Sequence, residues 1–212
     1  MEPLFTERGV FIALEGGEGG GKSTQAERLA RTLRDRGHDV VLTREPGGTD
    51  VGTALRRIVL DHATGEVSAR TEALIYAADK AEHVDTVVLP ALAAGSVVIT
   101  DRYVDSALAY QGAGRSIDAQ ELEQVLRWAT SDLRPHLTVV LDVDPRTGLS
   151  RAGDHDRIEA EPLAFHQRVR EHFLALAAED AQHYLVVPGD EQPDEQAERI
   201  LAAVEPWLGQ AQ

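Results

Sequence analysis

The sequence contains no cysteine and no asparagine, and only two of its 212 residues are lysine, Lys22 and Lys80. Without cysteine the chain can form neither a disulfide bond nor a thiolate metal site, which suits a reducing compartment. The first residues lack the basic and apolar regions of a signal peptide. The least polar longer stretch, residues 87–99, is interrupted by proline and glycine and falls short of the ~20 apolar residues of a membrane span. We therefore expect a soluble cytoplasmic protein with no membrane partner.

Positive charge is also scarce, because 36 acidic residues face 21 basic ones and the formal net charge is −15. Such a surface repels polyanions on average, and the sequence contains no basic stretch to offset it, so we expect no nucleic acid polymer as partner. Nineteen of the basic residues are arginine. Small anionic substrates held by local arginines fit this composition, although a general preference for arginine explains the shortage of lysine equally well.

A glycine-rich stretch matches the phosphate-binding pattern G-x-x-x-x-G-K-[ST], and five of the six residues from 16 to 21 are glycine. Residues 10–14 before it predict a buried strand, and residues 24–36 after it predict a helix. This strand, loop and helix would surround a polyphosphate with backbone N–H groups. We expect Lys22 to bridge the β- and γ-phosphates and the Ser23 hydroxyl to bind Mg²⁺.

Asp101 and Arg102 follow a second apolar strand, residues 96–100. In phosphate-loop proteins a carboxylate at this place is the usual second support of Mg²⁺, and the adjacent Arg102 would stabilise the transferred phosphoryl group. A structural ion pair is the alternative. The absence of asparagine excludes the N-K-x-D guanine signature, so a GTPase switch is not expected.

Three further places are candidates for substrate contacts. The loop at residues 44–49, which contains Glu45 and Pro46, follows a predicted strand and would face the same crevice, although its sequence also fits a simple turn. Arg56 could bind a monophosphate with both guanidinium arms. Tyr76 and Lys80 lie four residues apart in a helical pattern over residues 68–94, where they would present a ring and a cation on one face. Core packing with a lysine that reaches solvent explains that pair equally well.

Five predicted strands alternate with helices, which predicts an α/β fold: a parallel sheet with helices on both faces. We expect one domain over residues 1–212. Residues 110–115 are predicted as a flexible polar loop. Residues 146–160 carry Arg151 and Arg157 among glycine and aspartate, which suits a lid over phosphates, or else a solvated, salt-bridged loop.

Six segments of the sequence stand in an order known from one protein family: residues 12–24, 43–49, 71–79, 101–103, 109–112 and 156–159. Through them the sequence resembles the thymidylate kinase family over nearly the whole chain. The resemblance implies a three-layer P-loop kinase fold and transfer of the γ-phosphoryl group of ATP to dTMP, which gives dTDP. It also implies Mg²⁺ and a homodimer. A kinase for another pyrimidine nucleoside monophosphate, or for a deoxynucleoside, is the alternative.

The resemblance assigns roles to individual residues. Those implied to bind ATP are Gly16, Gly17, Glu18, Gly19, Gly20, Gly21, Lys22, Ser23, Thr24 and Arg151. Those implied to bind the acceptor are Glu45, Pro46, Arg56, Tyr76, Lys80, Arg102 and Gln111, and those implied in catalysis are Lys22, Arg102, Glu18 and Arg157. Ser23 and Asp101 would bind the metal. Within the acceptor site, Glu18 would lie near the deoxyribose, Tyr76 would stack on thymine and Gln111 would lie over the base.

The sequence departs from the family's pattern at three positions and in the lid. Lys80 stands where arginine is usual, Tyr76 where phenylalanine is commoner, and Ala107 where a small polar residue often faces the pyrimidine. The lid is shorter and poorer in arginine than the family's. Lysine can donate to a carbonyl oxygen but cannot form the planar fork of a guanidinium. These changes leave phosphoryl transfer intact and bear on the choice of base.

Overall fold

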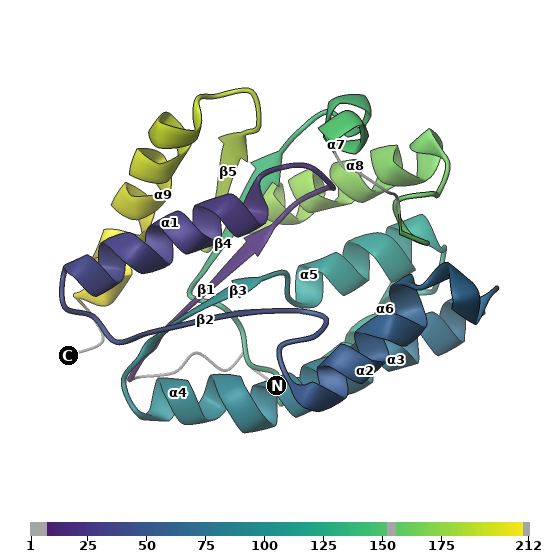
Figure 1. Ribbon diagram of the computed structural model, residues 1–212, viewed down its shortest axis with the longest axis horizontal. Coiled ribbons are helices and arrows are strands. Elements are labelled where there is room, and N and C mark those ends of the chain that lie inside the picture. The colour runs from purple at the N-terminus through teal and green to yellow at the C-terminus, as the bar shows by residue number, and fades with distance from the viewer. Residues whose placement is uncertain (1–7, 152–155, 210–212) are drawn as a thin grey trace.

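A computed structural model describes residues 8–151 and 156–209 of the chain, and one parallel sheet lies at its centre (Figure 1). Its strands run side by side in the order β2-β3-β1-β4-β5. Their bounds are β1 Val10–Glu15, β2 Val40–Arg44, β3 Val97–Asp101, β4 Leu137–Asp142 and β5 Tyr184–Pro188. The predicted α/β class and five-stranded parallel sheet are therefore confirmed.

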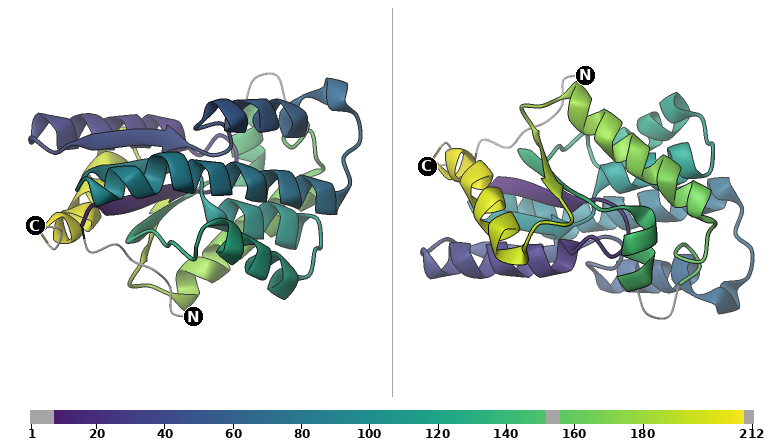
Figure 2. Two further views of the ribbon diagram at one scale, coloured as in Figure 1. Left: turned by 90° about the horizontal axis from the view of Figure 1, so that it is seen from below. Right: turned by 90° about the horizontal axis from the view of Figure 1, so that it is seen from above.

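Helices cover both faces of the sheet and complete three layers (Figure 2). They are α1 Lys22–Asp35, α2 Asp50–Leu60, η1 His62–Thr64, α3 Ala69–His83, η2 Val84–Val88, α4 Leu89–Ala93, α5 Val104–Ala107, η3 Leu108–Gly114, α6 Ala119–Ala129, α7 Pro145–Arg151, α8 Leu163–Glu179 and α9 Pro193–Leu208. Successive residues of β1 point to opposite faces of the sheet and pack under different helices. Ile12 and Leu14 pack under α1 and α9, whereas Phe11 and Ala13 pack under α3 and α6. A strand buried on both faces is apolar throughout, as β1 is.

The strand register brings the ends of three strands together. Leu14 in β1 lies opposite Asp101 in β3, and Asp101 lies opposite Arg44 in β2. Because all strands are parallel, the loops after them meet at one edge of the sheet, where ligands bind in open α/β folds.

The helical pattern predicted over residues 68–94 is one helical stretch with a wider turn in the middle. α3 continues through the π-helical turn η2 into α4, and Pro90 lies in the first turn of α4, where its missing N–H is tolerated.

The prediction of a flexible loop at residues 110–115 is wrong. Residues 108–114 form the π-helical segment η3, in which Tyr110 and Gln111 are buried. The glycines misled the prediction, since Gly114 is a packing position: an added Cβ would lie 2.5 Å from Cε2 of Phe165 in α8. Part of the predicted lid is also helical, as α7, while residues 152–155 of it lie outside the described residues.

Within the described residues, no helix is both long enough and apolar enough to cross a membrane.

Phe11 offers a test of the core beneath β1. Its ring is fully buried and meets the Tyr103 ring edge-on at 4.9 Å between centroids. Phe11→Ala should lower the free energy of unfolding by about 3–5 kcal/mol, because it removes apolar contacts and leaves a cavity. Phe11→Leu should cost less, since leucine fills much of the space. Urea denaturation followed by circular dichroism measures both losses, and equal losses would contradict the close packing around the Phe11 ring.

Candidate functional site

The loop between β1 and α1 packs through its backbone, which explains its glycines. Gly16 and Gly19 adopt φ angles of 127° and 64°. An added Cβ would lie 2.4 Å from the carbonyl oxygen of Leu141 at Gly16, and 2.1 Å from that of Gly148 at Gly19. Only glycine fits these two places, so the loop is held against β4 and α7 by close backbone contacts.

Lys22 begins α1 and lies almost fully buried in this loop. Its Nζ donates to the Gly17 carbonyl oxygen at 2.7 Å. Burial lowers the pKa of Lys22, and the positive charge of Arg102 lowers it further. The loop borders a cavity of about 250 Å³, which we call the loop cavity. The N–H groups at the start of a helix and a lysine beside them make an arrangement that suits an anion. The lining residues are Glu18, Gly19, Gly20, Gly21, Lys22, Ser23, Thr24, Arg44, Glu45, Arg56, Asp101 and Arg102.

Ser23 and Asp101 meet at the wall of the loop cavity. The Ser23 hydroxyl donates to Oδ2 of Asp101 at 2.5 Å, although the two residues are 78 positions apart. A hydroxyl and a carboxylate are hard oxygen ligands of the kind Mg²⁺ takes, and Mg²⁺ usually adds phosphate and water oxygens to a few protein ligands. Among the described residues, no group of three or more histidine, aspartate or glutamate side chains could hold a metal ion.

Glu18 and Arg102 form the ion pair at the centre of the site. Glu18 Oε1 accepts from Arg102 Nη2 at 2.7 Å and from the Tyr110 hydroxyl at 2.7 Å. The guanidinium also lies 5.1 Å from the centroid of the Tyr110 ring. Burial acts to raise the pKa of Glu18, but the charges of Arg102 and Lys22 outweigh it and lower the pKa to about 2. Glu18 is therefore ionised at neutral pH, and Arg102 is oriented before any ligand binds.

The backbone at Arg102 is in the left-handed region, with a φ of 74°, which is uncommon for a residue other than glycine. Three hydrogen bonds support it. Arg102 N–H donates to Leu14 O at 2.9 Å, and Nη1 donates to Gly16 O and to Ser106 Oγ, both at 3.1 Å. The buried carboxylate of Glu15 then accepts from the Ser106 hydroxyl at 2.6 Å. Strain of this kind concentrates where function needs a fixed side chain.

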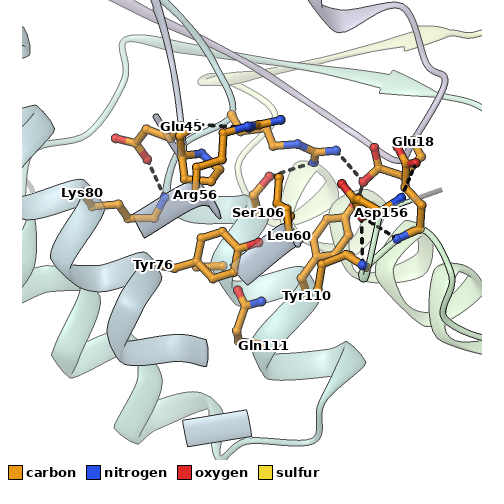
Figure 3. Close-up of a pocket in the computed structure, with 15 residues that line it drawn as sticks. Glu18, Glu45, Arg56, Leu60, Tyr76, Lys80, Ser106, Tyr110, Gln111 and Asp156 are labelled. Carbon is orange, nitrogen blue, oxygen red and sulfur yellow. Dashed lines mark hydrogen bonds and ion pairs between the residues drawn. The ribbon is translucent and has the colours of Figure 1, made fainter. Parts of the chain in front are cut away.

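A second cavity of about 110 Å³, the inner cavity, opens beside the first (Figure 3). It contains every residue that the sequence assigns to the acceptor: Glu45, Pro46, Arg56, Tyr76, Lys80, Arg102 and Gln111. It adds Glu18, Leu60, Ser106, Ala107, Tyr110, Asp156, Ile158 and Glu159. Burial raises the pKa of the Tyr76 hydroxyl, so this residue presents a neutral ring. The combination of an aromatic face with polar groups is typical of a small-molecule site.

Arg56 reaches both cavities from α2. Its Nη1 donates to the Pro46 carbonyl oxygen at 3.0 Å, and burial together with the nearby charge of Arg44 lowers its pKa. Arg44 lines the loop cavity, and no role of its own was predicted for it from the sequence. Its position at the end of β2, as the first residue of the candidate loop 44–49, was the signal that could have identified it.

Lys80 lies deeper than the sequence implied. Its side chain is 2% exposed, and Nζ donates to Glu45 Oε2 at 2.5 Å and to the Tyr103 carbonyl oxygen at 2.8 Å. Glu45 Oε1 pairs with His83 Nδ1 at 2.7 Å. Burial acts to raise the pKa of Glu45, but Lys80 and His83 outweigh it and hold the pKa below its usual value. Lys80 therefore neutralises a buried carboxylate at the wall of the inner cavity. Its contact with a base stays a prediction.

The two lid arginines lie in different surroundings. Arg151 Nη1 is 3.4 Å from Gly19 O and 3.5 Å from Gly189 O, so the guanidinium lies beside the phosphate loop. Arg157 instead donates to Val59 O at 2.8 Å and pairs with the buried Glu72. The roles assigned to both arginines stay predictions.

Five residues of the site had no role in the sequence-based prediction. They belong to the site through contacts between distant segments, and all of them except Ser106 lie in segments that carried the resemblance. The five are Glu15, Glu72, Ser106, Tyr110 and Asp156.

The buried pair of Lys80 and Glu45 yields a test of stability. Lys80→Met should lower the free energy of unfolding by about 3–5 kcal/mol, because it leaves a buried carboxylate without its lysine. Arg36→Met is the control, since Arg36 pairs with Glu205 at the surface, where such a change should cost at most about 1 kcal/mol. Urea denaturation measures both. Equal losses would mean that Lys80 is solvated.

Comparison with known proteins agrees with the resemblance seen in the sequence. A protein-family model described as thymidylate kinase matches residues 14–200. The chain is 55% identical over 183 residues to a thymidylate kinase of Clavibacter sepedonicus, with 84% of this chain and 86% of that protein covered. It is 54% identical over 196 residues to a thymidylate kinase of Leifsonia xyli subsp. xyli, with 91% and 92% covered.

A solved structure agrees in fold. The crystal structure of thymidylate kinase from Ehrlichia chaffeensis superposes with a TM-score of 0.78 at 29% sequence identity, and the match covers 93% of this chain and 99% of that one. Together with the phosphate loop and the adjoining inner cavity, these matches show that the chain belongs to the thymidylate kinase family.

Proposed function

We propose that ATP binds in the loop cavity and dTMP in the inner cavity, so that the acceptor phosphate meets the γ-phosphoryl group beside Arg102. As a member of the thymidylate kinase family, the chain phosphorylates dTMP to dTDP. One observation carries the assignment of the two cavities: they share Glu18, Glu45, Arg56 and Arg102 in their walls. A donor and an acceptor placed on either side of this wall would meet between two arginines.

The reaction needs positioning and positive charge more than covalent chemistry. An oxygen of the dTMP phosphate attacks the γ-phosphorus, the bond from that phosphorus to the β,γ-bridging oxygen breaks, and ADP leaves. Lys22 would hold the β- and γ-phosphates, while Arg102 and Arg56 would hold the acceptor phosphate. Ser23 and Asp101 would hold Mg²⁺, which when bound offsets the charge of the ATP phosphates.

Within the inner cavity, Tyr76 would stack on thymine, and Glu18 would lie near the deoxyribose. Lys80 still has one of its three N–H groups without a described acceptor, and this group would reach a carbonyl oxygen of the base. Gln111 lines the same cavity. Pro46 would close the cavity on the side of Arg56, which donates a hydrogen bond to the Pro46 carbonyl oxygen.

Residues 146–160 are proposed as the lid of a single domain that spans residues 1–212. Arg151 already lies beside the phosphate loop and would contact ATP. Arg157 would add positive charge during transfer. Because the phosphate loop carries Glu18 where one branch of the family has an additional arginine, lid arginines are the natural source of that charge.

Other acceptors are less well supported. A deoxynucleoside has no phosphate, so Arg56 and Arg102 would face no anion in such a complex. The curated relatives at 42–55% identity are thymidylate kinases, so another pyrimidine monophosphate is not favoured either. Both dTMP and ATP are cytoplasmic metabolites, which supports a cytoplasmic location.

A homodimer is proposed from the resemblance and from exposed apolar side chains on neighbouring helices. Leu74 of α3 is 54% exposed and Trp128 of α6 is 83% exposed, and the two helices lie side by side (Figure 1). Large apolar side chains exposed together favour contact with a second copy of the chain.

Lys22→Ala tests the donor site. It should lower kcat by a factor on the order of 10³ or more, because a principal electrostatic stabiliser of phosphoryl transfer is lost. ADP release is measured with ATP, Mg²⁺ and each of dTMP, dUMP, dCMP and thymidine. Arg28→Ala, on the outer side of the same helix, is the control and should leave kcat unchanged. Near-normal kcat in folded Lys22→Ala, or equal kcat/KM for thymidine and dTMP in the wild type, would overturn the assignment.

Sedimentation velocity tests the dimer. The wild type should sediment with twice the 23.0 kDa mass of the chain. Leu74→Arg should shift the protein toward a single chain, because it places a charge in the apolar contact. The control Arg31→Glu, on α1 in the opposite layer, should leave the mass unchanged. A wild type of single-chain mass at micromolar concentration would refute the dimer.

A further inference from the structure

Glu72 is a fully buried carboxylate in the first turn of α3, and four hydrogen bonds converge on it. Oε1 accepts from Gln111 Nε2 at 3.0 Å and from Arg115 Nε at 3.1 Å. Oε2 accepts from Arg115 Nη2 at 3.3 Å and from Arg157 Nη2. Burial acts to raise the pKa of Glu72, but these donors outweigh it and lower the pKa. Glu72 is therefore ionised and can only accept hydrogen bonds.

This carboxylate fixes the orientation of the Gln111 side chain. An amide has one donating and one accepting end, and only the donating end can face an ionised carboxylate. Nε2 of Gln111 must therefore face Glu72, so Oε1 is directed away from it. The amide orientation follows here from the chemistry of the neighbours and not from the placement of similar atoms.

Among the described residues, none donates to the accepting end of Gln111. The residue is 1% exposed and lines the inner cavity, where its amide is seen beside Tyr76 (Figure 3). Because Gln111 lines the cavity, a ligand that brings a donor to this oxygen gains a hydrogen bond that no described residue supplies. The inner cavity thus offers an acceptor to whatever base enters it.

Pyrimidine bases differ in what they present to such an acceptor. Thymine and uracil carry an imino N3–H donor between two carbonyl groups. Cytosine has a lone pair at N3, which would face the Gln111 oxygen and repel it. A site built to pair with one polar group rejects an analogue that lacks it far more strongly than an apolar pocket does.

We propose that Glu72 is a positioning residue that sets the base preference of the inner cavity by holding the Gln111 amide with its oxygen toward the base. Glu72 itself touches no substrate. The proposal rests on the proposed function, in which dTMP occupies this cavity. Arg115 and Arg157 complete the arrangement, because they keep Glu72 charged and fixed in place.

Glu72→Gln should reverse the Gln111 amide. The new side chain has only one accepting oxygen. Two guanidinium N–H groups, from Arg115 and Arg157, point at the present Oε2 position. Only one guanidinium N–H and one amide N–H point at the Oε1 position. The oxygen of the new amide should take the Oε2 position and its NH₂ the Oε1 position. Gln111 would then turn its own oxygen toward that NH₂ and present Nε2 to the base, where it can donate to N3 of cytosine.

The experiment measures kcat and KM for dTMP, dUMP and dCMP with the full-length wild type, Glu72→Gln and Glu72→Asp. For Glu72→Gln, kcat/KM for dTMP relative to dCMP should fall by about 10- to 100-fold, mainly through KM, and dUMP should follow dTMP. Glu72→Asp keeps an acceptor-only group and should keep the wild-type ratio, even where its rates are lower. A folded Glu72→Gln with the wild-type ratio would overturn the proposal. If Glu72→Gln does not fold, a Glu72→Asp variant that loses the ratio would overturn it.

A double variant that also lacks the Gln111 amide distinguishes the positioning role of Glu72 from a merely structural role. In Gln111→Ala the amide is gone, so adding Glu72→Gln should leave the ratio of dTMP to dCMP unchanged. A further fall of the ratio in that double variant would show that Glu72 acts by another route and would overturn the proposal. A wild type inactive on dTMP would overturn the proposed function and this proposal together, whereas an active wild type with an unaltered ratio in Glu72→Gln overturns this proposal alone.

Discussion

The structure depends on one buried carboxylate at the end of the central strand, that of Glu15. It is fully buried and carries no lysine or arginine partner of its own among the described ion pairs. It is satisfied by the N–H groups of Tyr103 at 2.8 Å and Ser106 at 3.1 Å, and by the Ser106 hydroxyl. Burial raises its pKa to about 7, with a further contribution from Asp105. The strand that leads into the phosphate loop is thereby tied to the start of α5.

The hydrogen bonds of Glu15 determine the position of Arg102. The chain leaves β3 at Asp101 and must bend sharply to deliver Tyr103 and Ser106 to Glu15, and the left-handed backbone at Arg102 makes that bend. The side chain of Arg102 is then directed toward Gly16 and Glu18. Asp101, Arg102 and the phosphate loop therefore share one rigid corner of the fold. Such preorganisation suits phosphoryl transfer, in which positioning is most of the catalysis.

How far the sequence predicts this site depends on how many positions separate the partners of each interaction along the chain. The phosphate loop is local in sequence, so its glycines, Lys22 and the flanking elements were predictable. The pairing of Lys80 with Glu45 spans 35 positions and that of Arg157 with Glu72 spans 85, and no local pattern indicates such partners. The mistaken loop at residues 110–115 has a similar cause. Its glycines serve packing between helices that the sequence places far apart.

The charge of the site also reconciles an acidic protein with anionic substrates. A net charge of −15 disfavours the approach of phosphates to the surface as a whole. At the loop cavity, however, Lys22, Arg44, Arg56 and Arg102 lie together. Without a ligand these cations would repel one another, and Glu18 reduces that repulsion by pairing with Arg102. Arg102 keeps N–H groups that its bonds to Gly16, Ser106 and Glu18 do not use. An incoming phosphate can accept from these groups while Glu18 keeps the guanidinium orientation fixed. The acidic residue of the loop thus maintains the anion site in a state that a phosphate can enter.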